Sequence, residues 1–218
     1  MRLKDKLQAL RATSLGRLDP ETWSGLSAAI ERLRMMQLAE HSLAVGDTLP
    51  DFELPDSAGK VVSSSELLDR GPLVLAFFRG GWCPYCDVTM RALEAARPRL
   101  EELPAGLVGV VPEKPEVLAQ FSAERGLGFP LLSDRGGRLA RLCGVFYDMS
   151  PAQIAYYRDK RELDLPALGA GTGWELPLPA TYVVGRDGVV AYAFADADWA
   201  QRAEPNEIIE AARRLASA

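Results

Sequence analysis

The chain has 218 residues and a net charge of −5 at pH 7, from 25 Lys and Arg against 30 Asp and Glu. This length suits one buried domain with an extension, and the scattered charges exclude a basic surface of the kind that binds nucleic acids. The first residues are charged where a signal peptide is apolar, and no apolar stretch reaches the roughly 18–20 residues that cross a membrane. We therefore expect a cytoplasmic protein with no nucleic-acid and no membrane partner.

Residues 1–44 are predicted to form a helical extension. A first helix runs to about Ala12, and a second begins at the capping residue Asp19, with Pro20 at its first helical position. Apolar residues recur at helical spacing up to about Glu40. Because an apolar stripe indicates burial without naming the partner, the extension either covers its own domain or contributes to a homodimer contact.

Residues 45–218 are predicted to form the main domain. It opens with a hairpin around a turn at 56–59. The continuous apolar run from Leu73 to Phe78 is typical of a strand that is buried on both faces of a sheet. A helix follows this strand, and the strand, helix and strand predicted over 106–132 imply a parallel, right-handed crossover.

The last third of the chain is predicted to return to the same sheet. Two short helices are expected near 137–142 and 150–157, and a last helix runs over about 205–215. Between them, the apolar runs within 181–192 flank an Asp-Gly turn, which is a strong hairpin signal. We expect an α/β fold in which helices flank a central mixed sheet.

A dithiol motif follows the apolar strand and opens a helix. Cys83 and Cys86 are separated by Pro84 and Tyr85, and a C-x-x-C pair in this context is typical of thioredoxin-like redox proteins. Three residues apart on one helical turn, the sulfurs face the same side and can close a disulfide. The chain has only 3 cysteines, too few for a disulfide scaffold, so we expect the pair to cycle between thiols and disulfide.

The two cysteines are expected to have different roles. Cys83 lies at the start of the helix, where the helix dipole stabilises a thiolate, and we expect it to be the exposed, attacking thiol. Cys86 lies one turn further in and is expected to be the resolving thiol. Pro84 suits the first helical position. Asp87 opposes a thiolate and Arg79 favours one, and the sequence leaves that balance open.

Metal and cofactor chemistry is not expected. Zinc needs four ligands, and only Cys143 and His41 remain to complete a site with the C-x-x-C pair. Cys143 is predicted to be a buried core residue rather than a second resolving thiol. His41 is predicted to be solvated or to lie at a helix end rather than to act as a catalytic base.

Residues 45–215 resemble the peroxiredoxin-like, AhpC/TSA-type redoxins on a thioredoxin fold. The resemblance rests on the strand with F-x-x-G-x-W-C-x-x-C and on the closing order of two strands and a helix. In an ungapped alignment of this motif, the peroxide-attacking cysteine of peroxiredoxins falls on Cys86. Their Thr falls on Cys83, their Pro on Arg79 and their Arg on Pro179, so all three partners of the attacking cysteine are replaced.

These replacements resemble thioredoxin-like disulfide oxidoreductases, in which a cis-proline faces the C-x-x-C motif. Pro179, two residues before Thr181, falls at that position, which implies a cis bond and a backbone edge that is free to pair with an extended substrate. In the same alignment Cys83 is the attacking thiol and Cys86 the resolving thiol. The residues expected to support the site are Arg79, Trp82, Pro84, Tyr85, Pro179 and Thr181.

Three functions remain open. We first expect a thiol oxidoreductase that exchanges two electrons between the Cys83/Cys86 dithiol and a disulfide or another oxidised thiol. The alternative is a thiol-dependent peroxidase that reduces hydroperoxides, and a trans bond at Pro179 or an arginine at Cys86 would favour it. Both enzymes imply a reducing partner such as a thioredoxin or glutathione system. From another class, the protein could be a redox-sensing binding module.

Overall fold

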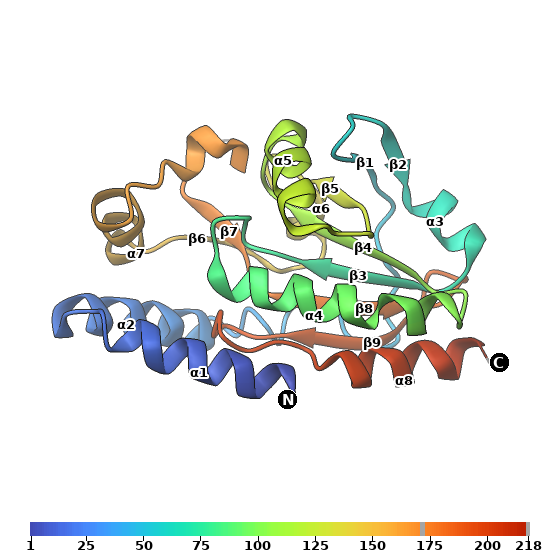
Figure 1. The fold of residues 1–218 in the computed structure, drawn as a ribbon, viewed down its shortest axis with the longest axis horizontal. Coiled ribbons are helices and arrows are strands. Elements are labelled where there is room, and N and C mark those ends of the chain that lie inside the picture. Colours follow the sequence, from blue (N-terminus) through green and yellow to red (C-terminus); the bar gives the residue numbers. More distant parts are fainter. Residues whose placement is uncertain (171–172, 217–218) are drawn as a thin grey trace.

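A five-stranded mixed sheet forms the centre of the computed structural model, which describes residues 1–170 and 173–216 (Figure 1). The strands lie across the sheet in the order β5 (Leu131–Ser133), β4 (Gly106–Val111), β3 (Leu73–Phe77), β8 (Ala180–Val184) and β9 (Val190–Ala195). Strands β3, β4 and β5 are parallel, whereas β8 is antiparallel to both β3 and β9. The predicted α/β fold with a central mixed sheet is confirmed.

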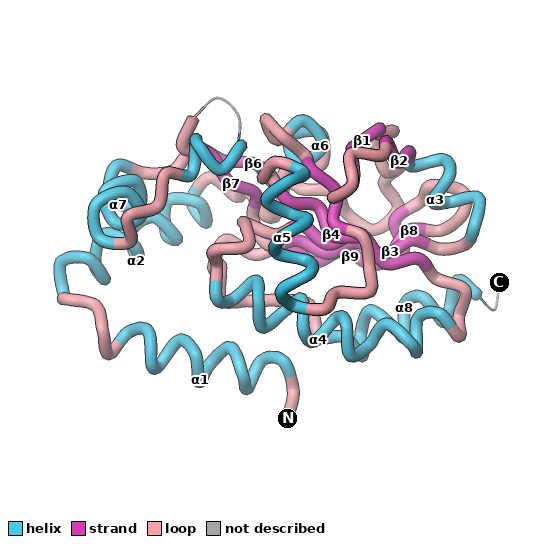
Figure 2. The backbone as a smooth tube through the Cα atoms, turned by 45° about the horizontal axis from the view of Figure 1, so that its top comes forward, coloured by secondary structure: helices cyan, strands magenta, loops and turns pink. Residues whose placement is uncertain are grey.

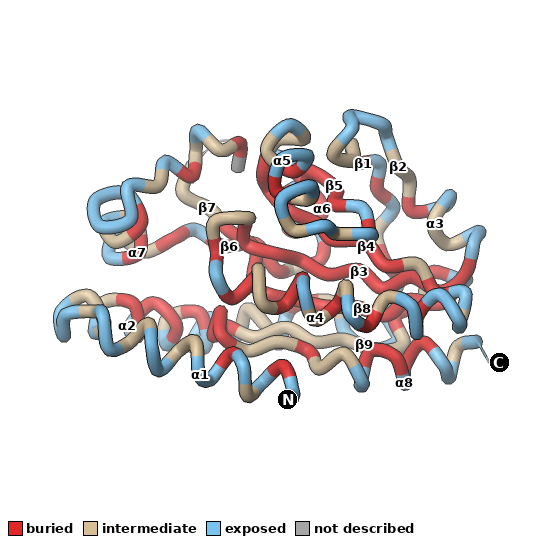
Figure 3. Tube along the Cα trace, in the orientation of Figure 1, coloured by how far each residue is buried: buried red, intermediate tan, exposed pale blue. Residues whose placement is uncertain are grey.

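Strand β3 is the buried centre of this sheet. All its residues are buried, as expected of an apolar run that is covered on both faces (Figure 3). Leu75 lies opposite Val108 of β4 on one side and opposite Tyr182 of β8 on the other. The end of β3, from which the dithiol segment departs, is therefore held from both sides.

Two small antiparallel sheets flank the centre. Strands β1 (Glu53–Pro55) and β2 (Val61–Ser63) form the predicted N-terminal hairpin. Strand β6 (Phe146–Asp148) pairs with β7 (Glu175–Pro177), and this second sheet was not predicted. Strands of three residues carry too little periodicity to be recognised in a sequence.

Helices flank the sheet. They are α3 (Ser64–Arg70), α4 (Pro84–Glu101), α5 (Pro115–Arg125), α6 (Arg138–Leu142), α7 (Pro151–Ala155) and α8 (Pro205–Ala216), with π-helical segments η1 (Tyr156–Lys160) and η2 (Pro166–Ala170). Helices α4 and α8 lie side by side against the sheet, and α5 packs beside the edge strand β5 (Figure 2). No helix within the described residues is long and apolar enough to span a bilayer.

The N-terminal extension consists of α1 (Leu3–Leu15) and α2 (Pro20–Met35). Asp19 caps α2 by accepting a hydrogen bond from the backbone N–H of Thr22 at 2.9 Å. The apolar stripe of α2 is buried in the same core as the sheet, and α1 lies against α4 while α2 lies against α7 (Figure 1). The extension therefore covers its own domain, which was one of the two alternatives. The homodimer contact and the domain boundary after residue 44 stay predictions.

Candidate active site

The dithiol lies at the turn that connects β3 to α4. Cys83 is the N-cap residue of α4, and Pro84 occupies the first helical position, as the sequence predicted. The backbone N–H of Cys83 donates to the carbonyl of Gly80 at 3.2 Å, and the Cys83 carbonyl accepts from Asp87 N–H at 3.0 Å. Both cysteines are free thiols, with Cys86 one helical turn in.

The prediction of an exposed Cys83 is wrong. Its exposed fraction is 1%, and that of Cys86 is 0%. Cys83 borders a cavity of about 60 Å³ whose walls come from the N-terminal helices, the dithiol turn, the segment around Tyr157 and the loop after β9. Helical periodicity in the sequence does not reveal that segments so distant along the chain meet over the start of α4.

Arg79 lies beside Cys83 in an aromatic cage. The guanidinium is buried, its Nη2 donates to the hydroxyl of Tyr157 at 3.0 Å, and its Nη1 lies 4.0 Å from the Cys83 sulfur. The rings of Trp82, Tyr157 and Trp199 lie 5.3, 5.5 and 5.3 Å from its central carbon, within the range of cation–π attraction. Within residues 1–170 and 173–216 no carboxylate forms an ion pair with Arg79. A thiolate at Cys83 can therefore act as its counter-charge.

The environment separates the acidities of the two thiols. The pKa of Cys83 falls to about 5, chiefly because the Cys86 thiol donates a hydrogen bond to the Cys83 thiolate and then because Arg79 and Arg202 are near. Burial raises the pKa of Cys86, and the neighbouring Cys83 raises it further. At neutral pH, Cys83 is thus the thiolate and Cys86 the protonated partner. Asp87 was expected to oppose the thiolate that Arg79 favours. Its carboxylate instead forms ion pairs with Arg91 and Arg125.

Arg202 approaches the other sulfur from the loop after β9. Its Nη2 lies 3.6 Å from the Cys86 sulfur, and its buried Nε has no hydrogen-bond partner in the described part of the chain. The Arg202 Nη1 donates to the carbonyls of Trp199 and Gln201, which fixes the guanidinium against the loop. Arg202 was not predicted as a site residue, because it lies 116 positions from Cys86 and belongs to no motif.

The prediction of a cis bond at Pro179 is also wrong. No described peptide bond is cis, so the bond before Pro179 is trans. The preceding segment is strand β7, and the chain runs from it in an extended conformation directly into β8. The Pro179 carbonyl accepts a hydrogen bond from Asp196 N–H at 3.3 Å. This carbonyl is therefore already bonded within the protein and is not free to pair with a substrate. Thr181 is buried in β8 opposite Ala76, and neither Pro179 nor Thr181 lines the cavity at Cys83.

The other predicted supporting residues come together around Cys83. Trp82, Pro84 and Tyr85 all line the cavity with Arg79. The Trp82 ring contacts the Tyr157 ring edge to face, with 4.9 Å between centroids. The segment from Arg79 to Tyr85 therefore forms one wall of the site.

Glu113 is a site residue that the sequence reasoning missed. It follows β4, its exposed fraction is 2%, and its Oε2 accepts a hydrogen bond from the backbone N–H of Gly81 at 2.8 Å. Burial raises the pKa of this carboxyl to about 7, and the nearby Cys83 contributes in the same direction. Glu113 could have been predicted from the order of the strands. Because β3 and β4 are parallel, residues that follow the two strands lie at the same edge of the sheet.

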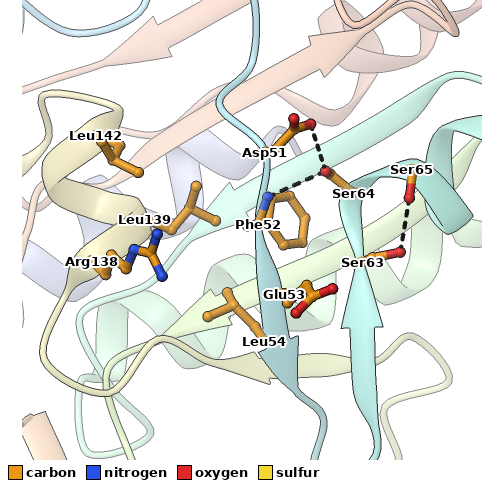
Figure 4. A pocket seen from close by; sticks show the side chains of 10 residues that line it. All are labelled: Asp51, Phe52, Glu53, Leu54, Ser63, Ser64, Ser65, Arg138, Leu139 and Leu142. Atoms are coloured by element: carbon orange, nitrogen blue, oxygen red, sulfur yellow. Dashed lines mark hydrogen bonds between the residues drawn. The ribbon is translucent and has the colours of Figure 1, made fainter.

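A wider pocket lies away from the dithiol, between the β1–β2 hairpin and α6 (Figure 4). Its volume is about 410 Å³, and its lining residues include no cysteine. There, Ser64 Oγ bridges Asp51 and the backbone N–H of Phe52. Among the described residues no group of three or more His, Cys, Asp or Glu side chains is placed to hold a metal ion.

Comparison with known sequences places this site in a family context. The profile described as the AhpC/TSA family matches residues 45–193. The chain is 31% identical over 108 residues to Peroxiredoxin Bcp of Escherichia coli (strain K12), an alignment that covers 50% of this chain and 69% of that protein. The region matched by the profile contains the dithiol, β3, β4, β5 and β8, and it ends within β9.

Solved structures show the same fold. Peroxidoxin BcpB from Mycobacterium tuberculosis superimposes with a TM-score of 0.62 at 25% identity and covers 79% of this chain and 98% of its own. The bacterioferritin comigratory protein of Xanthomonas campestris, whose alkyl peroxide reduction activity is the subject of its structure, superimposes with a TM-score of 0.56 at 20% identity, over 76% of this chain and 92% of its own.

Proposed function

The chain belongs to the AhpC/TSA family and is an oxidoreductase, and from this premise we propose that it is a thiol-dependent peroxidase that reduces hydroperoxides through Cys83 and Cys86. The observation that carries the proposal is an arginine at each sulfur. Arg79 lies 4.0 Å from the Cys83 sulfur and Arg202 lies 3.6 Å from the Cys86 sulfur. Guanidinium groups stabilise the negative charge that develops when a thiolate cleaves an O–O bond.

In the first step, the Cys83 thiolate attacks the terminal oxygen of the hydroperoxide. A sulfur–oxygen bond forms and the O–O bond breaks, so the sulfur is oxidised by two electrons to a sulfenic acid. The alkoxide or hydroxide that leaves takes a proton from water and departs as an alcohol or as water. The buried guanidinium of Arg79 stabilises the charge as it moves from sulfur to oxygen.

In the second step, the Cys86 thiol attacks the sulfur of the sulfenic acid. A disulfide forms between Cys83 and Cys86, and the hydroxyl leaves as water together with the Cys86 proton. An external dithiol then reduces the disulfide by exchange through a mixed disulfide. A thioredoxin-type or glutathione system would supply these electrons, and we propose the cytoplasm as the compartment.

Cys83 is proposed as the attacking thiol although the family alignment puts the peroxide-attacking cysteine at Cys86. Two observations support this assignment: the pKa of Cys83 is lowered to about 5, and Cys83 is the cysteine that lines the cavity. Cys86 is protonated and donates to the Cys83 thiolate, which suits a resolving thiol.

Reduction of protein disulfides is less well supported. An extended disulfide substrate needs a free backbone edge beside the dithiol, whereas the Pro179 carbonyl is already bonded within the protein. A sensor that only binds would not need an arginine at each sulfur.

The test is a paired assay of the purified protein with a dithiol reductant. Hydrogen peroxide should be consumed catalytically, and an insulin-type disulfide should not be reduced. Cys83→Ser should abolish peroxide turnover, whereas Cys86→Ser should still react once and retain a sulfenic acid, seen as the added mass of one oxygen atom on the intact protein. Disulfide reduction without peroxide consumption would reject the peroxidase, and a sulfenic acid retained in Cys83→Ser would reverse the roles of the two cysteines.

A further inference from the structure

The cavity at Cys83 is lined in part by residues from outside the family-matched region. The match covers residues 45–193, but the N-terminal helices and their connection contribute side chains to the cavity wall. These residues are Ser14, Leu15, Leu18, Trp23 and Leu26. Arg79, Cys83 and several aromatic residues line the same cavity, so the N-terminal extension and Cys83 share it.

The size of this cavity limits what can reach the sulfur. Its volume is about 60 Å³, whereas the pocket between the β1–β2 hairpin and α6 has about 410 Å³ by the same measure. The cavity at Cys83 is therefore narrow, and a small peroxide such as hydrogen peroxide suits it better than a bulky one. A hydroperoxide that carries an aromatic ring would meet the residues of the N-terminal helices that line this cavity.

The N-terminal helices are attached to the loop after β9, which carries Trp199 and Arg202. In α1, Arg11 pairs with the buried Asp198, and the backbone N–H groups of Leu3 and Lys4 donate to the Glu204 carboxylate at 3.2 and 2.7 Å. The same loop carries the ring that stacks on Arg79 and the guanidinium of Arg202 at Cys86.

A second attachment holds the start of α2. The Lys160 ammonium donates to Asp19 at 2.6 Å and also to the hydroxyl of Thr22. Because the helices are tied down at both α1 and α2, their side chains present a defined wall to the substrate rather than a loose cover.

We infer that the N-terminal helices determine the substrate size of this enzyme: the site takes hydrogen peroxide and hydroperoxides of similar size, and it excludes bulky organic hydroperoxides. The inference rests on the proposed peroxidase function. Leu18 and Trp23 are specificity-determining residues because they form the wall that a larger substituent on the peroxide would meet. The wall contacts the group attached to the oxygen that leaves. It therefore affects which peroxide binds and not the cleavage of the O–O bond.

The experiment compares kcat/KM for hydrogen peroxide with kcat/KM for cumene hydroperoxide in the full-length chain. The wild type should favour hydrogen peroxide by ~100-fold, and Leu18→Ala or Trp23→Ala should lower this ratio by about tenfold, because removing a few methylene groups from a pocket wall changes discrimination by that order. Met35→Ala is the matched control, since Met35 lies on α2 with an exposed fraction of 78% and does not line the cavity. Its ratio should equal that of the wild type.

The outcomes distinguish the two proposals. If the wild type consumes neither peroxide, the proposed function fails. If it consumes both with similar kcat/KM, or if the wall variants keep the wild-type ratio, the size inference is overturned while the peroxidase stands. Trp23 also stacks with Arg11 at 5.6 Å, so circular dichroism should accompany Trp23→Ala. If Trp23→Ala unfolds, the ratio of the two kcat/KM values in Leu18→Ala tests the size inference.

Discussion

At the scale of single residues, the acidity of Cys83 depends first on its partner thiol. The Cys86 thiol donates a hydrogen bond to the Cys83 thiolate, and this contributes more to the lowered pKa than either arginine. A free cysteine titrates near 8.5. Between about pH 5 and that value, the folded protein binds fewer protons than the unfolded chain, so this group makes the protein more stable as pH rises.

We predict that Cys86→Ala raises the pKa of Cys83 by roughly 1–2 units, because alanine cannot donate to the thiolate. Cys86→Ser should raise it less, since the serine hydroxyl can still donate. The pH dependence of the ultraviolet absorbance of the thiolate measures the change in both variants. Cys143 does not interfere, because burial raises its pKa to about 12. Equal pKa values in the Ala and Ser variants would show that the hydrogen bond is not the cause.

At the scale of elements, the turn between β3 and α4 is anchored to the end of β4. The anchor is the hydrogen bond from Gly81 N–H to the buried carboxylate of Glu113. Burial raises the pKa of this carboxyl from 4.5 to about 7. Between these values the folded protein binds more protons than the unfolded chain, so the free energy of unfolding falls as pH rises through this window and levels off above it.

We predict that Glu113→Gln is more stable than the wild type at pH 8, by an amount on the order of 2 kcal/mol. The glutamine carbonyl can still accept from Gly81, but it carries no charge to be buried. Near pH 5 the difference should disappear, because the wild-type carboxyl is then protonated in the folded state. Urea unfolding at the two pH values measures this, with the exposed Glu116→Gln as the control. A difference that is equal at both pH values would contradict the assignment.

At the scale of the whole molecule, the N-terminal helices and the sheet domain share one core. Leu3, Leu7 and Leu26 of the extension are buried in the same cluster as the residues of β3. The ion pair of Arg11 with Asp198 adds a charged contact at this junction, where the Asp198 side chain is 5% exposed. A buried carboxylate that loses its cation is destabilising.

Arg11→Ala should therefore lower the free energy of unfolding by about 1–2 kcal/mol, less than for a fully buried pair because Arg11 is partly exposed. It should also speed limited proteolysis within residues 1–44. Arg17→Ala, at an exposed position just beyond α1, is the control and should change neither measurement. If Arg11→Ala leaves both proteolysis and the urea midpoint unchanged, the ion pair does not hold the extension.

The elements with local signals could be predicted from the amino-acid sequence. The apolar run of β3, the aspartate cap of α2 and the C-x-x-C pair at the start of α4 all depend on neighbours within a few positions, and each lies where it was predicted. The tertiary structure alone decided the burial of Cys83, the aromatic cage of Arg79, the approach of Arg202 to Cys86 and the trans bond at Pro179. Each of these depends on segments that meet only when the chain packs, and no local pattern records which distant segment arrives at the site.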